Sequence, residues 1–195
     1  MSQDREGPKL EEIAPGMIVA MPNLSDENFN RTVVLLLRST EEGAFGLVIN
    51  RGSGIPLASF CQEQQIDYRG PKGLEINLGG PVEVASHLLV LHGDEPVLSD
   101  KDEDELELMP GIRVVTAMTG LKALAGRGSE RFRCYLGYAG WGPGQLEWEL
   151  SQGAWVPLPS ESEFVFSSPG PAIWERALRS AGIDPISLVP GGAIN

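Results

Sequence analysis

The chain has 195 residues, of which 42% are hydrophobic and 22% are charged, and its formal net charge is −12. This length suits one domain that buries a core without a metal, and the two cysteines, Cys61 and Cys134, are too few for a disulfide framework. The acidic charge opposes contact with nucleic-acid phosphates, and no apolar run reaches the ~18 residues that a membrane span needs. We therefore expect no direct nucleic-acid binding and no membrane insertion. Because residues 1–12 lack an apolar leader, we also expect a cytoplasmic location.

The first half of the chain predicts short strands and one helix. Residues 1–12 are polar and are expected to be flexible, and the domain is expected to span 13–187. Residues 57–64 predict a helix, because Leu57, Phe60 and Cys61 fall on one side of it. Apolar runs bounded by turn residues predict strands, the second and third of them joined in a hairpin, at 16–21, 32–39, 44–50, 74–83 and 87–92.

The second half begins with an acidic loop at 99–107 and then mixes strands with helices. Strands are predicted at 112–118, 131–138, 154–159 and 163–166, and helices at 120–126, 145–152 and 171–182. Alternation along 131–138 places Phe132 and Cys134 on one face and Arg133 and Tyr135 on the other. Residues 188–195 are expected to form a tail. Because hairpins and isolated helices occur without a βαβα alternation, we predict a single α+β domain.

Three blocks of sequence carry a resemblance to a known family. The chain resembles the AlgH/YqgE family of bacterial cytosolic proteins at MPNLSDENFNRTVVLLLRSTEEGAFGLVINR, LGGPVE and LGYAGWGPGQLEWELSQGAW, in this order. The resemblance implies an α+β fold around one mixed, strongly curved and partly barrel-like sheet flanked by short helices. It implies no established enzymatic activity, and some members of the family are labelled transcriptional regulators.

The glycine-rich joint before the helix predicted at 145–152 is the first candidate site. Backbone N–H groups at the start of a helix can hold an anion, which makes Trp141, Gly142 and Gly144 candidate ligand-binding residues. The joint matches neither a P-loop nor a GxGxxG pattern. The alternative is a structural turn whose glycines let Trp141 and Trp148 pack closely.

A polar loop between the first two strands is the second candidate site. Asp26, Asn28 and Arg31 could bind a polar ligand there, with Gly79 and Gly80 and the tryptophan joint forming the other walls of a cleft. The alternative is that Asp26 and Asn28 only form turn hydrogen bonds and that Arg31 pairs with a nearby acid.

No pattern in the sequence predicts a metal or cofactor site. His87 and His92 would point to opposite faces of one strand and could not share a metal, and no zinc motif is present. The acidic loop begins like an EF-hand, but Glu105 and Gly111 stand where that loop needs glycine and glutamate. Cys61 and Cys134 lie on apolar faces and are expected to be unreactive. We expect no cofactor and no metal.

Three hypotheses for function follow, in order of preference. The first is a non-enzymatic binding or regulatory protein that acts through a partner protein or a small ligand. The second is an enzyme of unrecognised type in which Arg31 pairs with a small anionic substrate and Asp26 acts as acid or base. The third is a transcriptional regulator, for which the sequence contains no evident DNA-binding element. The sequence does not determine the oligomeric state.

Overall fold

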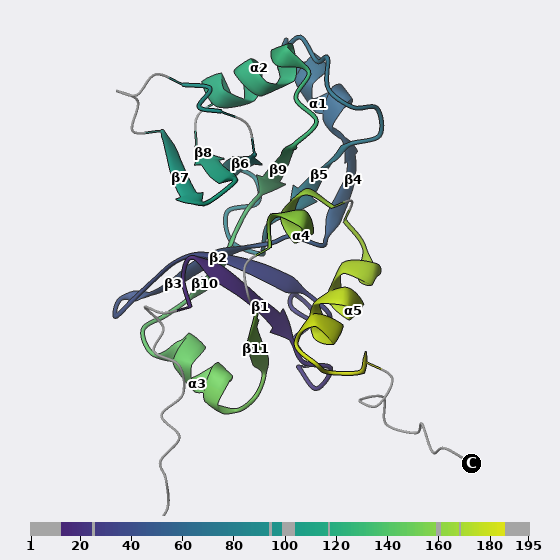
Figure 1. The fold of residues 1–195 in the computed structure, drawn as a ribbon. Helices are drawn as coiled ribbons and strands as arrows, with labels where there is room; N and C mark the ends of the chain where they lie inside the picture. Colours follow the sequence, from purple (N-terminus) through teal and green to yellow (C-terminus); the bar gives the residue numbers. More distant parts are fainter. Residues whose placement is uncertain are drawn as a thin grey trace, which may run out of the picture.

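The computed structural model describes residues 13–24, 26–93, 95–98, 104–116, 118–158, 161–167 and 169–185. The segments 1–12 and 188–195, expected to be a flexible start and a tail, lie outside the described residues. The described chain forms an α+β domain with two sheets and five short helices (Figure 1). The expectation of one strongly curved, partly barrel-like sheet is therefore wrong, because the strands divide between two sheets and neither sheet is closed or strongly curled.

The first sheet has five antiparallel strands in the order β10-β3-β2-β1-β11. Its strands are β1 Gly16–Ala20, β2 Val33–Thr40, β3 Gly43–Val48, β10 Ala139–Trp141 and β11 Trp155–Leu158. Aliphatic residues occupy both faces of the central strands, so that Val33 and Leu35 enter one core while Val34 and Leu36 enter another. This sheet is buried on both faces.

The second sheet has six strands in the order β4-β5-β9-β6-β8-β7, and only the β5–β9 pair is parallel. Its strands are β4 Gly52–Pro56, β5 Glu75–Leu78, β6 Leu88–His92, β7 Glu105–Met109, β8 Ile112–Val115 and β9 Phe132–Leu136. The strands β4, β7 and β10 were not predicted. Each is short or interrupted by glycine or charge, and each lies at the edge of its sheet.

The five helices of the described chain lie against the sheets (Figure 1), and the buried side chains form three cores. One core joins α1 Leu57–Glu63 and α2 Met118–Arg127 to one face of the second sheet. A second core lies between the two sheets and includes residues of α4 Ser162–Phe166 and α5 Pro171–Ser180. A third core lies between α3 Gln145–Ser151 and the other face of the first sheet.

The segment 163–166, predicted as a strand, is the helix α4 instead. Phe164 and Val165 are both buried although they are adjacent, which a two-sided edge strand would not allow. The buried guanidinium of Arg133 donates hydrogen bonds to the carbonyls of Phe166 and Ser167 at the end of this helix. These tertiary contacts link the helix to β9, and the local sequence does not encode them. Strand β9 is buried on both faces because Tyr135 enters the core between the sheets while Phe132 and Cys134 enter the core under α1 and α2.

The chain crosses between the two sheets at two neighbouring places, which we call the seam: Asn50–Arg51 joins β3 to β4, and Gly137–Tyr138 joins β9 to β10. The segment 78–82 lies between the crossings, because Val48 N–H donates to Gly79 at 2.7 Å and Gly79 N–H donates to Leu136 at 2.8 Å. A Cβ atom on Gly80 would overlap the backbone of Tyr138. The glycines of LGGPVE thus allow three backbones to meet.

Candidate functional site

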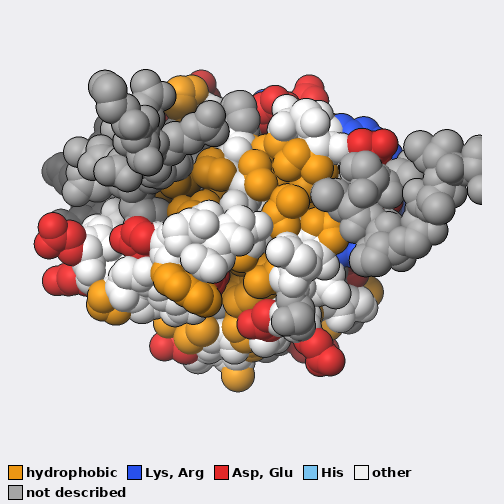
Figure 2. Space-filling view, turned by 90° about the horizontal axis from the view of Figure 1, so that it is seen from below, with side chains coloured by type: hydrophobic (Ala, Val, Ile, Leu, Met, Phe, Trp, Pro, Cys, Tyr) orange, Lys and Arg blue, Asp and Glu red, His pale blue; other side chains and the backbone are white. Residues whose placement is uncertain are grey.

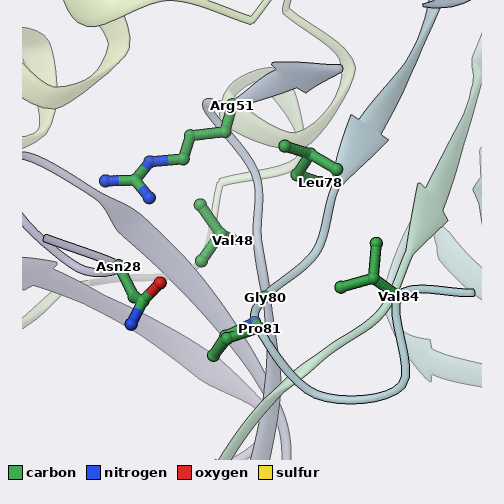
Figure 3. Close-up of a pocket in the computed structure, with 7 residues that line it drawn as sticks. All are labelled: Asn28, Val48, Arg51, Leu78, Gly80, Pro81 and Val84. Atoms are coloured by element: carbon green, nitrogen blue, oxygen red, sulfur yellow. The ribbon is translucent and has the colours of Figure 1, made fainter.

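A pocket of about 220 Å³ opens at the seam between the two sheets (Figure 3). Its lining comes from the turn before β2, the two strand ends at the seam and the segment after β5, and consists of Asn28, Val48, Arg51, Leu78, Gly80, Pro81 and Val84. Four of these side chains are apolar, and none of the seven carries a carboxylate. Within a chain of net charge −12, the pocket therefore presents one cation and one amide beside an apolar wall.

Among the described residues that line this pocket, Arg51 alone is charged, and its position is set by backbone carbonyls. Its Nη2 donates to the carbonyl of Glu27 at 2.9 Å and to that of Asn30 at 3.2 Å. A guanidinium has five N–H donors, and within the described residues Nε and Nη1 of Arg51 make no hydrogen bond. These donors remain for water or a ligand. Figure 3 shows the guanidinium and the Asn28 amide on one side and Leu78 and Val84 on the other.

The turn at 26–31 is fixed by hydrogen bonds with Asn50, which lies where the chain first crosses between the two sheets. Buried Asn50 accepts a hydrogen bond from Val33 N–H at 2.9 Å and donates from its amide to the carbonyl of Arg31 at 2.9 Å. Arg31 has a φ of 54°, a conformation that costs free energy in a residue other than glycine. Two consecutive residues, Asn50 and Arg51, therefore fix this turn over the pocket.

The structure brings some of the predicted loop residues together and separates others. Asn28 and Gly80 line the pocket, and Gly79 lies directly beside it without lining it. The carboxylate of Asp26 instead accepts a hydrogen bond from Asn28 N–H at 2.8 Å. The guanidinium of Arg31 lies over the ring of Trp174, 5.4 Å from its centroid, outside the pocket lining. Ligand binding by these residues stays a prediction.

The glycine-tryptophan joint does not line the pocket but packs in the third core. The ring of Trp141 stacks on Phe29 and meets Trp155 edge-on, with centroid distances of 5.7 and 5.8 Å. Both indole N–H groups donate to Oε2 of Glu149, at 3.0 Å for Trp141 and 2.7 Å for Trp155. The structural-turn alternative had both Trp141 and Trp148 closely packed; Trp141 is buried beside Trp155, whereas Trp148 is 64% exposed.

The segment just before α3 is held by a side chain of that helix, although no described side chain caps the helix itself. Gly144 stands before the helix with a φ of 72°, and Gly142 N–H donates to Oε1 of Gln145 at 3.1 Å. Glu147 lies in the first turn, where its negative charge competes with any bound anion. These contacts are those of a structural turn, and ligand binding at Gly142 and Gly144 stays a prediction.

The two histidines lie in separate environments. His87 is half-buried, 3.6 Å from a carboxylate oxygen of Glu83, and its ring packs against Tyr138. His92 is buried, with Nε2 3.2 Å from Oε1 of Glu105. Burial opposes ionisation of Glu105, but the N–H of Leu98, the guanidinium of Arg113, the N–H of Val97 and the charge of His92 together hold the pKa of that carboxyl below its usual value. Across the described residues, no three potential metal ligands gather in one place.

Neither thiol has the setting of a nucleophile. Cys61 and Cys134 are both fully buried, and burial raises the pKa of each thiol. This geometry agrees with the expectation of unreactive thiols.

Sequence reasoning missed Arg51, the residue with the most distinctive position in the pocket. It lies in the INR that ends the first block of the resemblance, directly after a buried strand. A cation at the end of a buried strand was the available signal, but nothing local showed that Leu78, Pro81 and Val84 would face it. Their proximity follows from the pairing of β5 with β9 and β4.

Comparison with known proteins places this architecture in a family. A model of the AlgH-like family matches residues 17–186. The chain belongs to the AlgH-like family. A UPF0301 protein of Myxococcus xanthus is 37% identical over 187 residues, covering 95% of this chain and 100% of the relative. A UPF0301 protein of Burkholderia vietnamiensis is 37% identical over 179 residues, covering 90% and 91%.

Solved structures share the AlgH-like fold. The solution structure of the AlgH protein from Pseudomonas aeruginosa is similar with a TM-score of 0.70 and 34% identity, over 100% of both chains. The crystal structure of a protein from Corynebacterium diphtheriae has a TM-score of 0.70 and 26% identity, over 91% of this chain and 89% of that one. Among the described residues, no helix combines the length and apolar character needed to cross a membrane.

Proposed function

We propose that this AlgH-like protein is a non-enzymatic binding and regulatory protein that takes a small anionic molecule with an apolar body into the seam pocket. The observation that carries the proposal is the guanidinium of Arg51, which is oriented by the carbonyls of Glu27 and Asn30 and keeps Nε and Nη1 for a ligand. An oxyanion would accept from these donors and from the Asn28 amide, while Leu78, Pro81 and Val84 cover the apolar body.

The pocket chemistry weighs against the enzyme hypothesis. Among the described residues that line the pocket, none is a carboxylate, histidine, cysteine, serine or lysine, so this part of the lining supplies neither a nucleophile nor a general base. In that hypothesis Asp26 was the acid or base and Arg31 the anion partner. The carboxylate of Asp26 is committed to Asn28 N–H, and Arg31 lies over Trp174.

A partner protein is the second route by which such a protein would act, and one observation supports it. Trp148 on α3 is 64% exposed, the largest exposed fraction among the large hydrophobic side chains of the described residues. Figure 2 shows the molecule from below, with apolar side chains gathered near the centre, acidic side chains toward the rim and basic ones at one margin. Exposed apolar surface of this kind is typical of protein-protein contacts.

Titration with benzoate, observed through backbone amide chemical shifts, tests the pocket. Benzoate carries a carboxylate on a flat apolar ring, and benzyl alcohol is the uncharged control of similar shape. We expect benzoate to shift the amides of Gly80 and Val84 saturably, and benzyl alcohol to shift them far less. Arg51→Met should weaken benzoate binding about tenfold or more, since a hydrogen bond to a charged group contributes ~1.5–3 kcal/mol.

The matched control is Arg38→Met. Arg38 is exposed on β2 and its side chain makes no hydrogen bond or ion pair with the described residues, so its loss should leave benzoate affinity unchanged. Equal effects of the two substitutions, or equal binding of benzoate and benzyl alcohol, would refute the proposed site.

A further inference from the structure

One guanidinium serves both the pocket and the turn above it. Nη2 of Arg51 donates to the carbonyls of Glu27 and Asn30, and its other donors make no hydrogen bond with the described residues. Because Arg51 also lines the pocket, a ligand in the pocket and the turn at 26–31 would bind different nitrogen atoms of the same guanidinium. Fixing an arginine side chain costs conformational entropy, and a group already fixed by one partner loses less when the second partner binds.

The turn carries an aromatic residue into a different core. Phe29 lies between the two residues whose carbonyls Arg51 contacts, and its own carbonyl accepts from the Thr32 hydroxyl at 2.8 Å. Its ring stacks on Trp141 at 5.7 Å with an interplanar angle of 23° and meets Trp155 edge-on at 5.7 Å. Phe29 does not line the pocket.

The contacts of Phe29 continue to α3. The indole N–H groups of Trp141 and Trp155 both donate to Glu149, which lies in that helix. A continuous series of contacts therefore runs from the pocket through Arg51, the turn and Phe29 to the helix that bears exposed Trp148.

We propose that ligand binding in the seam pocket is coupled, through Arg51, to the packing of Phe29 on Trp141 and Trp155. This inference rests on the proposed function and names the regulation of the same site. An occupied pocket stabilises the turn at 26–31 and its aromatic contacts, and correct packing of Phe29 in turn strengthens ligand binding, since coupling between two sites is reciprocal. The surface of α3 is the region that such binding would control.

The sign of the coupling follows from which atoms are occupied. A ligand on Nε and Nη1 leaves Nη2 with the turn, so binding and turn contacts support each other. A ligand that took Nη2 instead would release the carbonyls of Glu27 and Asn30 and loosen the turn. The two arrangements predict opposite changes in the turn's amide hydrogen exchange.

Amide hydrogen exchange of the wild-type protein, with and without saturating benzoate, is the first measurement. The N–H groups of Phe29 and Asn30 both donate to the carbonyl of Asp26 and report on the turn. We expect benzoate to slow their exchange about fivefold or more, the lower range of typical coupling. The N–H of Gly128, which closes a turn near α2, should exchange at an unchanged rate and serves as the control.

Benzoate affinity of two phenylalanine variants is the second measurement. Phe29→Leu should weaken binding about fivefold although Phe29 does not touch the pocket, whereas Phe60→Leu should leave it unchanged. Phe60 is likewise half-buried, but it packs in the core under α1 and α2. Amide spectra of both variants establish that each is folded.

The outcomes separate this inference from the function on which it rests. If benzoate binds wild-type protein at Gly80 and Val84 but leaves the exchange of Phe29 and Asn30 unchanged or faster, and Phe29→Leu binds as tightly as wild type, the coupling is wrong and the pocket stands. If benzoate causes no saturable shifts in wild-type protein, the proposed function fails and the coupling fails with it. The coupling and the proposed function are both supported if benzoate slows the exchange of Phe29 and Asn30, and if Phe29→Leu binds benzoate more weakly while Phe60→Leu does not.

Discussion

Glu149 is the residue whose replacement most directly tests the account of the aromatic core. Its Oε2 accepts from the indole N–H groups of Trp141 and Trp155, and its Oε1 accepts from the Gln145 amide at 2.8 Å. The two tryptophans are only 5% and 2% exposed, so their N–H groups have little access to water once the carboxylate is removed. Glu149→Ala leaves both donors without this acceptor.

The expected loss of stability follows from the two hydrogen bonds that the indole N–H groups donate to Glu149. A hydrogen bond to a charged group contributes about 1.5–3 kcal/mol, and because Glu149 is half-buried, its carboxylate stays partly hydrated and the lower value applies to each bond. We therefore expect Glu149→Ala to lower the free energy of unfolding by about 3 kcal/mol, a large part of the ~5–15 kcal/mol that holds a typical domain.

Urea unfolding followed by tryptophan fluorescence and circular dichroism measures this loss, and α3 supplies the control. Glu147 lies on the same helix, is exposed, and its side chain makes no hydrogen bond or ion pair with the described residues, so Glu147→Ala should change stability by less than about 0.5 kcal/mol. If the two variants unfold at the same urea concentration, the indole-carboxylate contacts do not stabilise the fold and the reasoning is refuted.

Two further predictions concern the buried carboxylate and the seam. Burial raises the pKa of the Glu105 carboxyl, but its hydrogen-bond donors outweigh burial and hold that pKa below the usual value. The ionised Glu105 carboxylate therefore stabilises the fold above its unfolded-state pKa, and this stabilisation is lost as pH falls through its folded-state pKa. Below about pH 5, the urea midpoint should fall less steeply with pH in Glu105→Gln than in wild type. Parallel pH profiles of the two proteins would contradict this. Gly80→Ala should destabilise the protein by more than about 1–3 kcal/mol, because the new methyl group overlaps the backbone of Tyr138. Thermal melts of this variant and of the control Gly126→Ala measure the loss. Apart from its chain neighbours and the backbone of helix α2, Gly126 has no atom within 4 Å of the added Cβ, so Gly126→Ala should be neutral or slightly stabilising. Similar losses in both variants would show that crowding at the seam is not the cause.

The candidate site was predictable only in part. The polar loop and the Gly-Gly segment were expected to approach each other, and the structure places Asn28 and Gly80 in one pocket. Trp141 was expected in the same cleft, but its ring enters the third core, where Phe29 and Trp155 surround it. A glycine-rich joint next to a tryptophan looks the same in sequence whether the ring faces a ligand or a core.

The sequence by itself determined those structural features that depend only on residues near one another along the chain. The apolar run at 32–39 and the turn after it predict the β2–β3 hairpin, and the spacing of Ile173, Trp174 and Ala177 predicts the buried side of α5, because strand alternation and helix periodicity are local properties. Three sequence blocks also carried the resemblance to the AlgH-like family, to which the chain belongs.

The tertiary structure alone decided how these elements meet. It divided the strands between two sheets, made residues 162–166 a helix that packs near Arg133, and brought Arg51 to Val84 across a seam built from separate crossings of the chain. Each of these outcomes depends on contacts between segments distant in sequence, whose free energy outweighs local propensity and leaves no periodic signal in the chain. The pocket exists because two crossings and three glycine-containing backbones converge at one place.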